Sequence, residues 1–174
     1  MEIKDIRVFV CAPSIGKSYL ASIDDRFVDL DEEKTIYKYG YDKDISRLKI
    51  EELKGNHGKA KNNDSMQYIK DRFLEELKGN KIILLAPYFL DILEEYNVPY
   101  CLIYASLKAK SKLVERMKNR GNQNNFIERI MDSYDEFCKK IKLDNRSIFK
   151  ISWDGEGYLS DILWAYFGKP VNKL

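Results

Sequence analysis

The chain has 174 residues, of which 44% are hydrophobic and 33% charged, a balance typical of one globular domain. Thirty Lys and Arg against 28 Asp and Glu leave a net charge of +2, which gives no general argument for a nucleic-acid partner, although a local basic cleft stays open. No apolar stretch approaches the roughly 20 residues of a membrane helix, and the start MEIKD runs straight into a strand-like segment, so we expect no membrane partner and a cytoplasmic location.

Short apolar runs alternate with longer amphipathic stretches along the chain. The runs are predicted to be strands, and they cover residues 6–11, 26–30, 81–86, 100–105 and 147–152. In the stretches between them, apolar residues recur every three or four positions, which is the period of a helix. These helical stripes cover residues 66–77, 126–141 and 158–167. Strands separated by helices predict an α/β fold with a parallel sheet and helices on both faces.

Two stretches interrupt this alternation. Residues 32–65 are polar and are predicted to be an insertion that contains a mobile loop. Residues 119–125, NRGNQNN, separate two helical patterns and are predicted to form a small flexible lid. We therefore expect a single domain, 1–174, with an insertion at about 32–65 and a lid at about 116–126.

The first predicted strand leads into CAPSIGKSYL, residues 11–20, which fits the pattern G-x-x-x-x-G-K-[ST] except at Cys11. A phosphate-binding loop needs a strand, a tight turn with exposed N–H groups, and a helix that begins at the anion. Lys17 would reach the β- and γ-phosphates of a nucleotide, and the Ser18 hydroxyl would bind Mg²⁺. An ordinary strand-to-helix turn is the alternative, but the position after the first strand favours the phosphate loop. The expected cofactor-binding residues are Cys11, Ala12, Pro13, Ser14, Ile15, Gly16, Lys17, Ser18 and Tyr19.

The second predicted strand ends in RFVDLDEE, where Asp29 and Asp31 point the same way because side chains alternate along a strand. Two carboxylates beside a triphosphate suit a magnesium ligand and an acceptor for a hydroxyl proton. Solvated acids or a helix cap are the alternative. The strand 81–86 ends in Ala86 and Pro87, so no acid is available there to organise Mg²⁺, which gives Asp29 more weight as the metal ligand.

Arg116 and Arg120 lie four residues apart in LVERMKNRGN, and hence on one helical face. Arginine forks suit phosphoryl oxygens whose charge must be neutralised during transfer. Two surface arginines are the alternative. Arg72, near the insertion, is a candidate for contact with an acceptor, although a surface role is more usual for such a residue.

Metal sites of other kinds are not indicated. Cys11, Cys101 and Cys138 lack metal-ligand spacing and are expected to be reduced, and a single histidine excludes a multi-histidine site.

These stretches together resemble the nucleoside monophosphate kinase and shikimate kinase group of P-loop proteins, and more narrowly small P-loop kinase-like proteins of bacteriophages and prophages. The resemblance covers most of the chain apart from the insertion. It rests on VFVCAPSIGKSYLA, FVDLDEE, YCLIYASLKAKSKLVERMKNRGN with NFIERI, and GYLSDIL. It implies a three-layer P-loop NTPase fold whose five-stranded parallel sheet has the order 2-3-1-4-5, with an acceptor-binding insertion and an arginine-bearing lid. For a phage protein it implies the bacterial host cytoplasm.

Residue by residue, the resemblance assigns Gly16, Lys17 and Ser18 to the nucleotide loop and Arg116 and Arg120 to the lid. Asp29 and Asp31 match the Asp-x-Asp pair that serves metal and acceptor in shikimate kinases. Two departures stand out. Cys11 replaces the first loop glycine, and Ser14 stands where adenylate kinases usually carry another. A side chain at either place could crowd the loop if its backbone needs a positive φ.

The sequence therefore predicts phosphoryl transfer from ATP, with Mg²⁺, to a small acceptor such as a nucleoside or nucleotide. Lys17, Asp29, Arg116 and Arg120 are the expected catalytic residues. Two alternatives stay open: a nucleotide-binding regulatory or host-interaction module without turnover, and a polynucleotide end kinase.

Overall fold

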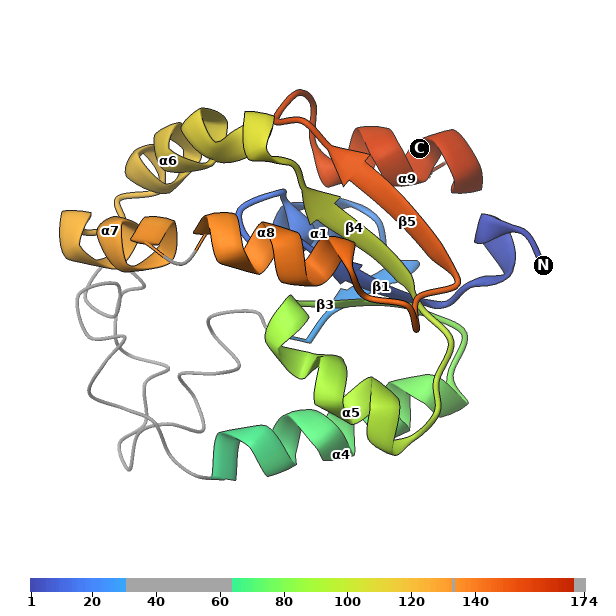
Figure 1. Cartoon of the computed structure of the whole chain (residues 1–174). Helices are drawn as coiled ribbons and strands as arrows, with labels where there is room; N and C mark the ends of the chain where they lie inside the picture. Colours follow the sequence, from blue (N-terminus) through green and yellow to red (C-terminus); the bar gives the residue numbers. More distant parts are fainter. Residues whose placement is uncertain (31–63, 133, 171–174) are drawn as a thin grey trace, which may run out of the picture.

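A computed structural model of the chain describes residues 1–30, 64–132 and 134–170 (Figure 1). Its strands form one five-stranded sheet in the order β2-β3-β1-β4-β5, and every neighbouring pair is parallel. This confirms the predicted parallel α/β fold and its strand order. Asp31 and residues 32–63 of the predicted insertion lie outside the described residues. The strands are β1 (Val8–Cys11), β2 (Phe27–Asp29), β3 (Ile82–Leu85), β4 (Cys101–Ala105) and β5 (Phe149–Trp153).

Burial of the strands follows their position in the sheet. Every residue of β1 and β3 is buried, and so is all of β4 except one half-buried residue, Tyr104. Strand β5, at the edge, alternates half-buried and exposed residues until Trp153. The nearly continuous apolar runs of the central strands are thus explained by helices that cover both faces of the sheet.

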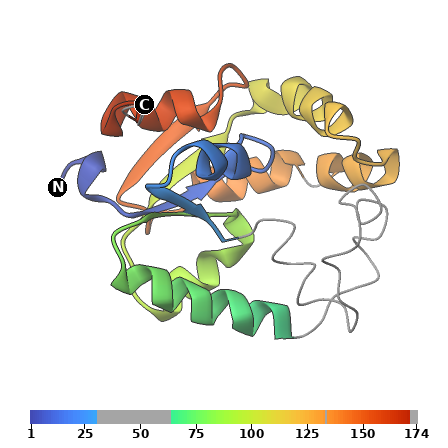
Figure 2. The ribbon, with the colours of Figure 1, turned by 180° about the vertical axis from the view of Figure 1, so that it is seen from behind.

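Helices cover both faces of the sheet (Figures 1 and 2), and the core consists of two clusters, one on each face. Because side chains alternate along a strand, Phe9 and Cys11 of β1 belong to one cluster while Val8 and Val10 belong to the other. The first cluster includes buried residues of α1 (Lys17–Ile23), α6 (Lys110–Asn119), α7 (Asn124–Asp132), α8 (Tyr134–Lys142) and α9 (Leu159–Phe167). The second includes residues of α4 (Asp64–Lys78) and α5 (Leu90–Glu95).

The helices differ from the predicted stripes in two respects. The stripe over residues 126–141 falls on two helices, α7 and α8, rather than one. Helix α5 was not predicted, because its six residues are too few to show a clear period. Short 3₁₀ helices cover Ile3–Asp5, Pro87–Phe89 and Leu107–Ala109. Within the described ranges, no helix has the length and apolar character needed to cross a membrane.

An ion pair between Asp24 and Arg26 ties α1 and β2 to the end of α9. The guanidinium donates to both carboxylate oxygens, at 2.9 and 2.7 Å, and also to the carbonyls of Phe167 and Gly168. Trp164 of α9 adds a third side-chain bond by donating its indole N–H to Asp24 Oδ2, at 3.0 Å. Asp24 is only 2% exposed, and the bonds from Arg26 hold the pKa of its carboxyl below the ordinary value.

We predict that Asp24→Asn lowers the free energy of unfolding at pH 7 by about 1–3 kcal/mol, because the half-buried donors of Arg26 and Trp164 lose a charged partner. The pKa of Asp24 is lower in the folded than in the unfolded chain. Its contribution is therefore complete above the ordinary aspartate range, about pH 4, and is lost as the pH falls through the folded pKa. Urea unfolding between pH 7 and pH 3 should show the difference between wild type and variant shrinking on acidification.

The control is Asp25→Asn, which removes the same charge from an exposed neighbour and should change stability by less than about 0.5 kcal/mol. Equal losses in the two variants, or a difference for Asp24→Asn that does not depend on pH, would contradict the prediction.

Candidate functional site

The turn between β1 and α1 is held by hydrogen bonds at both of its ends. The N–H of Ala12 donates to the Ile103 carbonyl of β4, at 2.9 Å. The Ile15 carbonyl accepts a 2.9 Å bond from the N–H of Leu159, the first residue of α9. Gly16 precedes α1 with φ +107°, a backbone conformation that strains residues with a Cβ. Helix α1 begins at Lys17, directly after this glycine.

The two residues that depart from the resembled pattern behave differently. Cys11 is the last residue of β1 and is fully buried, with its thiol 3.6 Å from the Phe9 carbonyl. Among the described non-glycine residues, positive φ occurs at Ser14 and Asn97, with Ser14 at +57°. Cys11 therefore adds no strain to the loop, whereas Ser14 takes the left-handed conformation that glycine adopts more easily.

Lys17, Ser18 and Asp29 come together where β1 and β2 end. Lys17 is only 9% exposed, and Asp29, the last residue of β2, is 5% exposed. The Ser18 hydroxyl donates to Asp29 Oδ2 at 2.6 Å. A hydroxyl and a carboxylate that converge in this way fit Mg²⁺, which binds few protein oxygens and completes its shell with water and phosphate.

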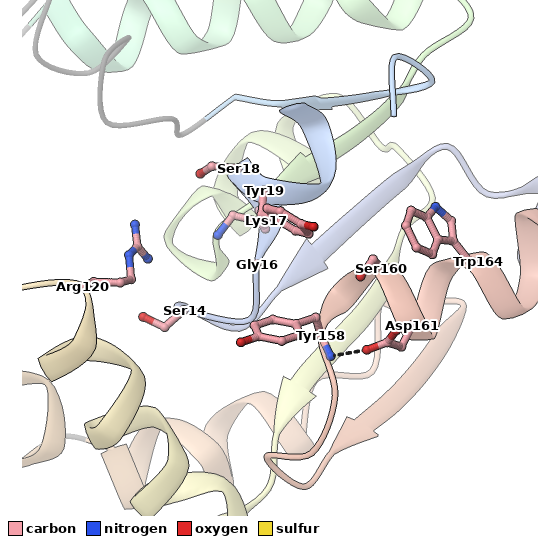
Figure 3. A pocket seen from close by; sticks show the side chains of 10 residues that line it. All are labelled: Ser14, Gly16, Lys17, Ser18, Tyr19, Arg120, Tyr158, Ser160, Asp161 and Trp164. Carbon is pink, nitrogen blue, oxygen red and sulfur yellow. Dashed lines mark hydrogen bonds between the residues drawn. The ribbon is translucent and has the colours of Figure 1, made fainter. Parts of the chain in front are cut away.

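A pocket of about 650 Å³ opens over this turn (Figure 3). The loop and the start of α1 form one part of its wall, Arg120 another, and the face of α9 from Tyr158 to Trp164 the rest. Its lining residues are Ser14, Gly16, Lys17, Ser18, Tyr19, Arg120, Tyr158, Ser160, Asp161 and Trp164.

The remaining predicted loop residues face elsewhere. Cys11, Ala12 and Ile15 are buried in the core cluster, so any contact they make with a phosphate must come from the backbone. Pro13 has no N–H to donate. The donors available from the loop are therefore the backbone groups from Ser14 onward.

The structure separates the two predicted lid arginines. Arg116, on α6, stacks against Trp153 and Tyr158, with its guanidinium carbon 4.7 and 4.4 Å from the two ring centroids. Its Nη2 donates to the carbonyls of Gly155 and Gly157, at 3.3 and 2.7 Å. Arg120 follows the last turn of α6 and lines the pocket. Of this pair, only Arg120 thus lines the pocket over the turn between β1 and α1.

The region predicted to be a lid lies between two packed helices. Helix α6 ends at Asn119, Gly121 takes φ +76°, and α7 begins at Asn124. Met117 and Ile127 are buried in the shared core cluster. This confirms the predicted break between two helical patterns and places Arg120 at the break.

Of the two predicted acceptor residues, the structure describes only Arg72. Asp31 lies outside the described residues. Arg72 is half-buried on α4, and it is not one of the described residues that line the pocket.

The start of α9 is a part of the site that the sequence reasoning did not assign. Tyr158, Ser160, Asp161 and Trp164 line the pocket, and the N–H of Tyr158 donates to Asp161 Oδ2 at 2.7 Å. A modest signal was present in WDGEGYLSDIL, where glycines after a strand precede a helix with an acid in its first turn. Nothing local in that pattern indicates that the helix begins against a loop about 140 residues earlier.

Comparisons with known proteins add little to this geometry. No protein-family profile matches the chain, and no curated protein matches its sequence. A crystal structure of an uncharacterised protein from Eubacterium ventriosum ATCC 27560 is similar, with 11% identity, a TM-score of 0.35, and coverage of 84% of this chain and 88% of the other. A likeness of this size supports no inference about fold or function.

We predict that Ser14→Gly stabilises the protein by about 0.5–1 kcal/mol, because relief of the left-handed backbone exceeds the greater chain entropy of glycine. The matched control is Ser22→Gly, the same exchange inside α1, which should cost about 0.5–1 kcal/mol. Urea unfolding of the two variants checks the opposite signs. A loss of stability in Ser14→Gly equal to that in Ser22→Gly would show that Ser14 carries no backbone strain.

Proposed function

We propose that this chain is a P-loop phosphotransferase that moves the γ-phosphoryl group of ATP to a small acceptor, with a nucleoside or nucleotide as the first acceptors to test. The supporting observation is that Lys17, the Ser18–Asp29 pair and Arg120 converge on one turn between the first strand and the first helix. The parallel sheet with strand order β2-β3-β1-β4-β5 agrees with the P-loop NTPase fold that the sequence resembles.

In this proposal the triphosphate lies over the loop. Backbone N–H groups from Ser14 to Ser18 donate to its oxygens, and Lys17 neutralises charge on the β- and γ-phosphates. Ser18 and Asp29 would hold Mg²⁺, which supplies charge neutralisation between those phosphates when it is bound. Their 2.6 Å hydrogen bond keeps the two oxygens close enough to share one ion.

Phosphoryl transfer consists mainly of positioning and charge stabilisation. The acceptor hydroxyl attacks the γ-phosphorus and releases its proton to solvent, the bond to the bridging oxygen breaks, and ADP leaves. In this proposal Arg120, which lines the pocket, would stabilise the charge on the transferring group. We propose instead that Arg116 holds the loop after β5 in position, because its guanidinium is bonded to two carbonyls of that loop and stacked on two rings. The assignment of Asp31 and Arg72 to the acceptor stays a prediction.

A nucleotide-binding module without turnover is the second candidate. The strained Ser14 and the carboxylate-free end of β3 favour it. The convergence of Ser18 and Asp29 favours the enzyme, because a module that only binds phosphate has no need to position a metal.

We expect Lys17→Ala to abolish both Mg²⁺–ATP binding and phosphoryl transfer, because the loop loses its cation. Calorimetry with Mg²⁺–ATP, followed by ADP release with a panel of nucleosides, nucleotides and a 5′-hydroxyl oligonucleotide, measures both properties. Circular dichroism and the thermal midpoint establish that the variant is folded. The control is Lys81→Ala, which removes an exposed lysine and should leave binding unchanged.

Wild-type turnover by a folded Lys17→Ala variant would refute the proposal. Tight ATP binding without ADP release across the whole panel would instead identify the module.

The two arginines provide a further test within one helix. Arg120→Ala should lower kcat by about 10³-fold at nearly unchanged stability, because it removes charge stabilisation from the transition state. Arg116→Ala should lower the free energy of unfolding by about 1–3 kcal/mol, because it removes the hydrogen bonds to the carbonyls of buried Gly155 and exposed Gly157 and the stacking on Trp153 and Tyr158. Steady-state kinetics together with urea unfolding separate the two effects. Equal kinetic losses at unchanged stability would place both arginines at the phosphoryl group.

A further inference from the structure

Strand β5 leaves one edge of the sheet open (Figure 1). It is the last strand in the order β2-β3-β1-β4-β5, and among the described residues it pairs with β4 alone. Alternate residues of β5 therefore point their backbone N–H and C=O groups away from the sheet, which makes this edge a template for pairing with another chain. The opposite edge offers less, because β2 has only three residues and all of them are buried.

The two faces of β5 are covered differently. Phe149 and Ile151 are half-buried against the core cluster that includes residues of α9. Lys150 and Ser152, on the opposite face, are exposed, and so is Asp154, which directly follows the strand. Because side chains alternate along a strand, these three polar side chains share one face, with a positive charge at one end and a negative charge at the other.

Both charged residues of this face are held by hydrogen bonds within the chain. The Lys150 ammonium donates to the Lys142 carbonyl at 2.9 Å and has further N–H donors to offer. Asp154 Oδ1 accepts the Glu156 N–H at 3.1 Å. The turn after Asp154 is closed by the Trp153 indole, which donates to the Glu156 carbonyl at 2.7 Å. The two charges are thus fixed near their places before a partner arrives.

A lysine on an edge strand usually discourages pairing between copies, because it meets no opposite charge. An antiparallel copy of β5 supplies one. When Ser152 lies opposite Ser152 of the second copy, Lys150 of each copy lies opposite Asp154 of the other. Opposite charges directly across an antiparallel pair stabilise it, and like charges destabilise it. The segment KISWD, residues 150–154, is therefore complementary in charge to a second copy of itself.

We infer that β5 pairs antiparallel with β5 of a second copy of this chain, with Ser152 on the two-fold axis, and that the sheet continues through the resulting homodimer. Two strands of five residues bury little area, so the dimer is transient, with a dissociation constant on the order of 10 µM. The inference does not depend on the proposed function, because none of these residues belongs to the pocket.

Sedimentation velocity of the full chain between about 1 and 100 µM protein measures this equilibrium. Wild type should shift from monomer to dimer across the range. Lys150→Asp and Asp154→Lys should each weaken the dimer by about tenfold or more, because each variant places like charges opposite each other at both ends of the paired strands. Circular dichroism establishes that both variants are folded.

The two variants together test the register. In a mixed dimer the Lys150→Asp copy carries only negative charges along this face and the Asp154→Lys copy only positive ones, so both cross-strand pairs attract again. An equimolar mixture should dimerise about as tightly as wild type, although neither variant does so alone. The matched control is Lys81→Asp, the same exchange at an exposed residue next to β3, which should leave the dimer unchanged.

Each of three results in sedimentation would overturn the inference. A wild-type chain that stays monomeric at about 100 µM lacks such a dimer. A dimer that survives both charge reversals uses another surface. A mixture of folded variants that does not dimerise excludes this register.

Hydrogen exchange provides a check that needs no variant. The β5 amides of wild type should exchange more slowly as the protein concentration rises through the dimerisation range, because pairing gives their N–H groups new acceptors. Exchange rates in β5 that do not depend on protein concentration would also overturn the inference.

Discussion

The hydrogen bond from the Leu159 N–H to the Ile15 carbonyl joins the start of the last helix to the first loop of the chain. At its other end, α9 is fixed through Trp164 and the carbonyl of Phe167 to the Asp24–Arg26 pair. Helix α9 is thus attached at both ends to the segments that flank α1. Because the pocket lies between the start of α1 and the start of α9, these two attachments set its width. Side chains of α1 and α9 keep their places in the pocket wall only while both attachments are intact.

The same attachment explains why two arginines on one helical face have different surroundings. The loop after β5 must turn back sharply to bring α9 to Ile15, and it exposes the carbonyls of Gly155 and Gly157 as it does so. Arg116 satisfies both carbonyls and packs between Trp153 and Tyr158. One turn later, Arg120 lies beyond this loop and reaches the pocket. The charge of Arg116 therefore stabilises the loop after β5. The charge of Arg120, one turn later, lies beside the turn between β1 and α1.

The sequence predicted those features that local patterns determine. Apolar runs located all five strands, and the strand order followed from the resemblance to P-loop kinases. Gly16, Lys17 and Ser18 were located by a motif whose residues are adjacent in the chain. The role of α9 was not predictable in this way, because Tyr158 and Trp164 reach the site only through tertiary contacts with residues near the start of the chain. The four-residue spacing of Arg116 and Arg120 also does not show which of the two bonds to the carbonyls of the loop after β5. The φ of Ser14 depends on how the turn is closed, which the residue type alone does not determine.

Ser14 and Cys11, the two departures from the resembled loop pattern, differ in their energetic costs. At the end of β1 the backbone is extended, so a side chain that packs into the core replaces glycine without strain, and Cys11 fills that space. At residue 14 the chain must turn with a positive φ, and the serine is held there by the fixed ends of the turn, the Ala12–Ile103 and Ile15–Leu159 bonds. Strained residues persist where the surrounding structure determines their conformation. Helix α9 therefore does more than form part of the pocket wall, because its first N–H also helps to keep the loop in the shape that directs Lys17 and Ser18 to one place.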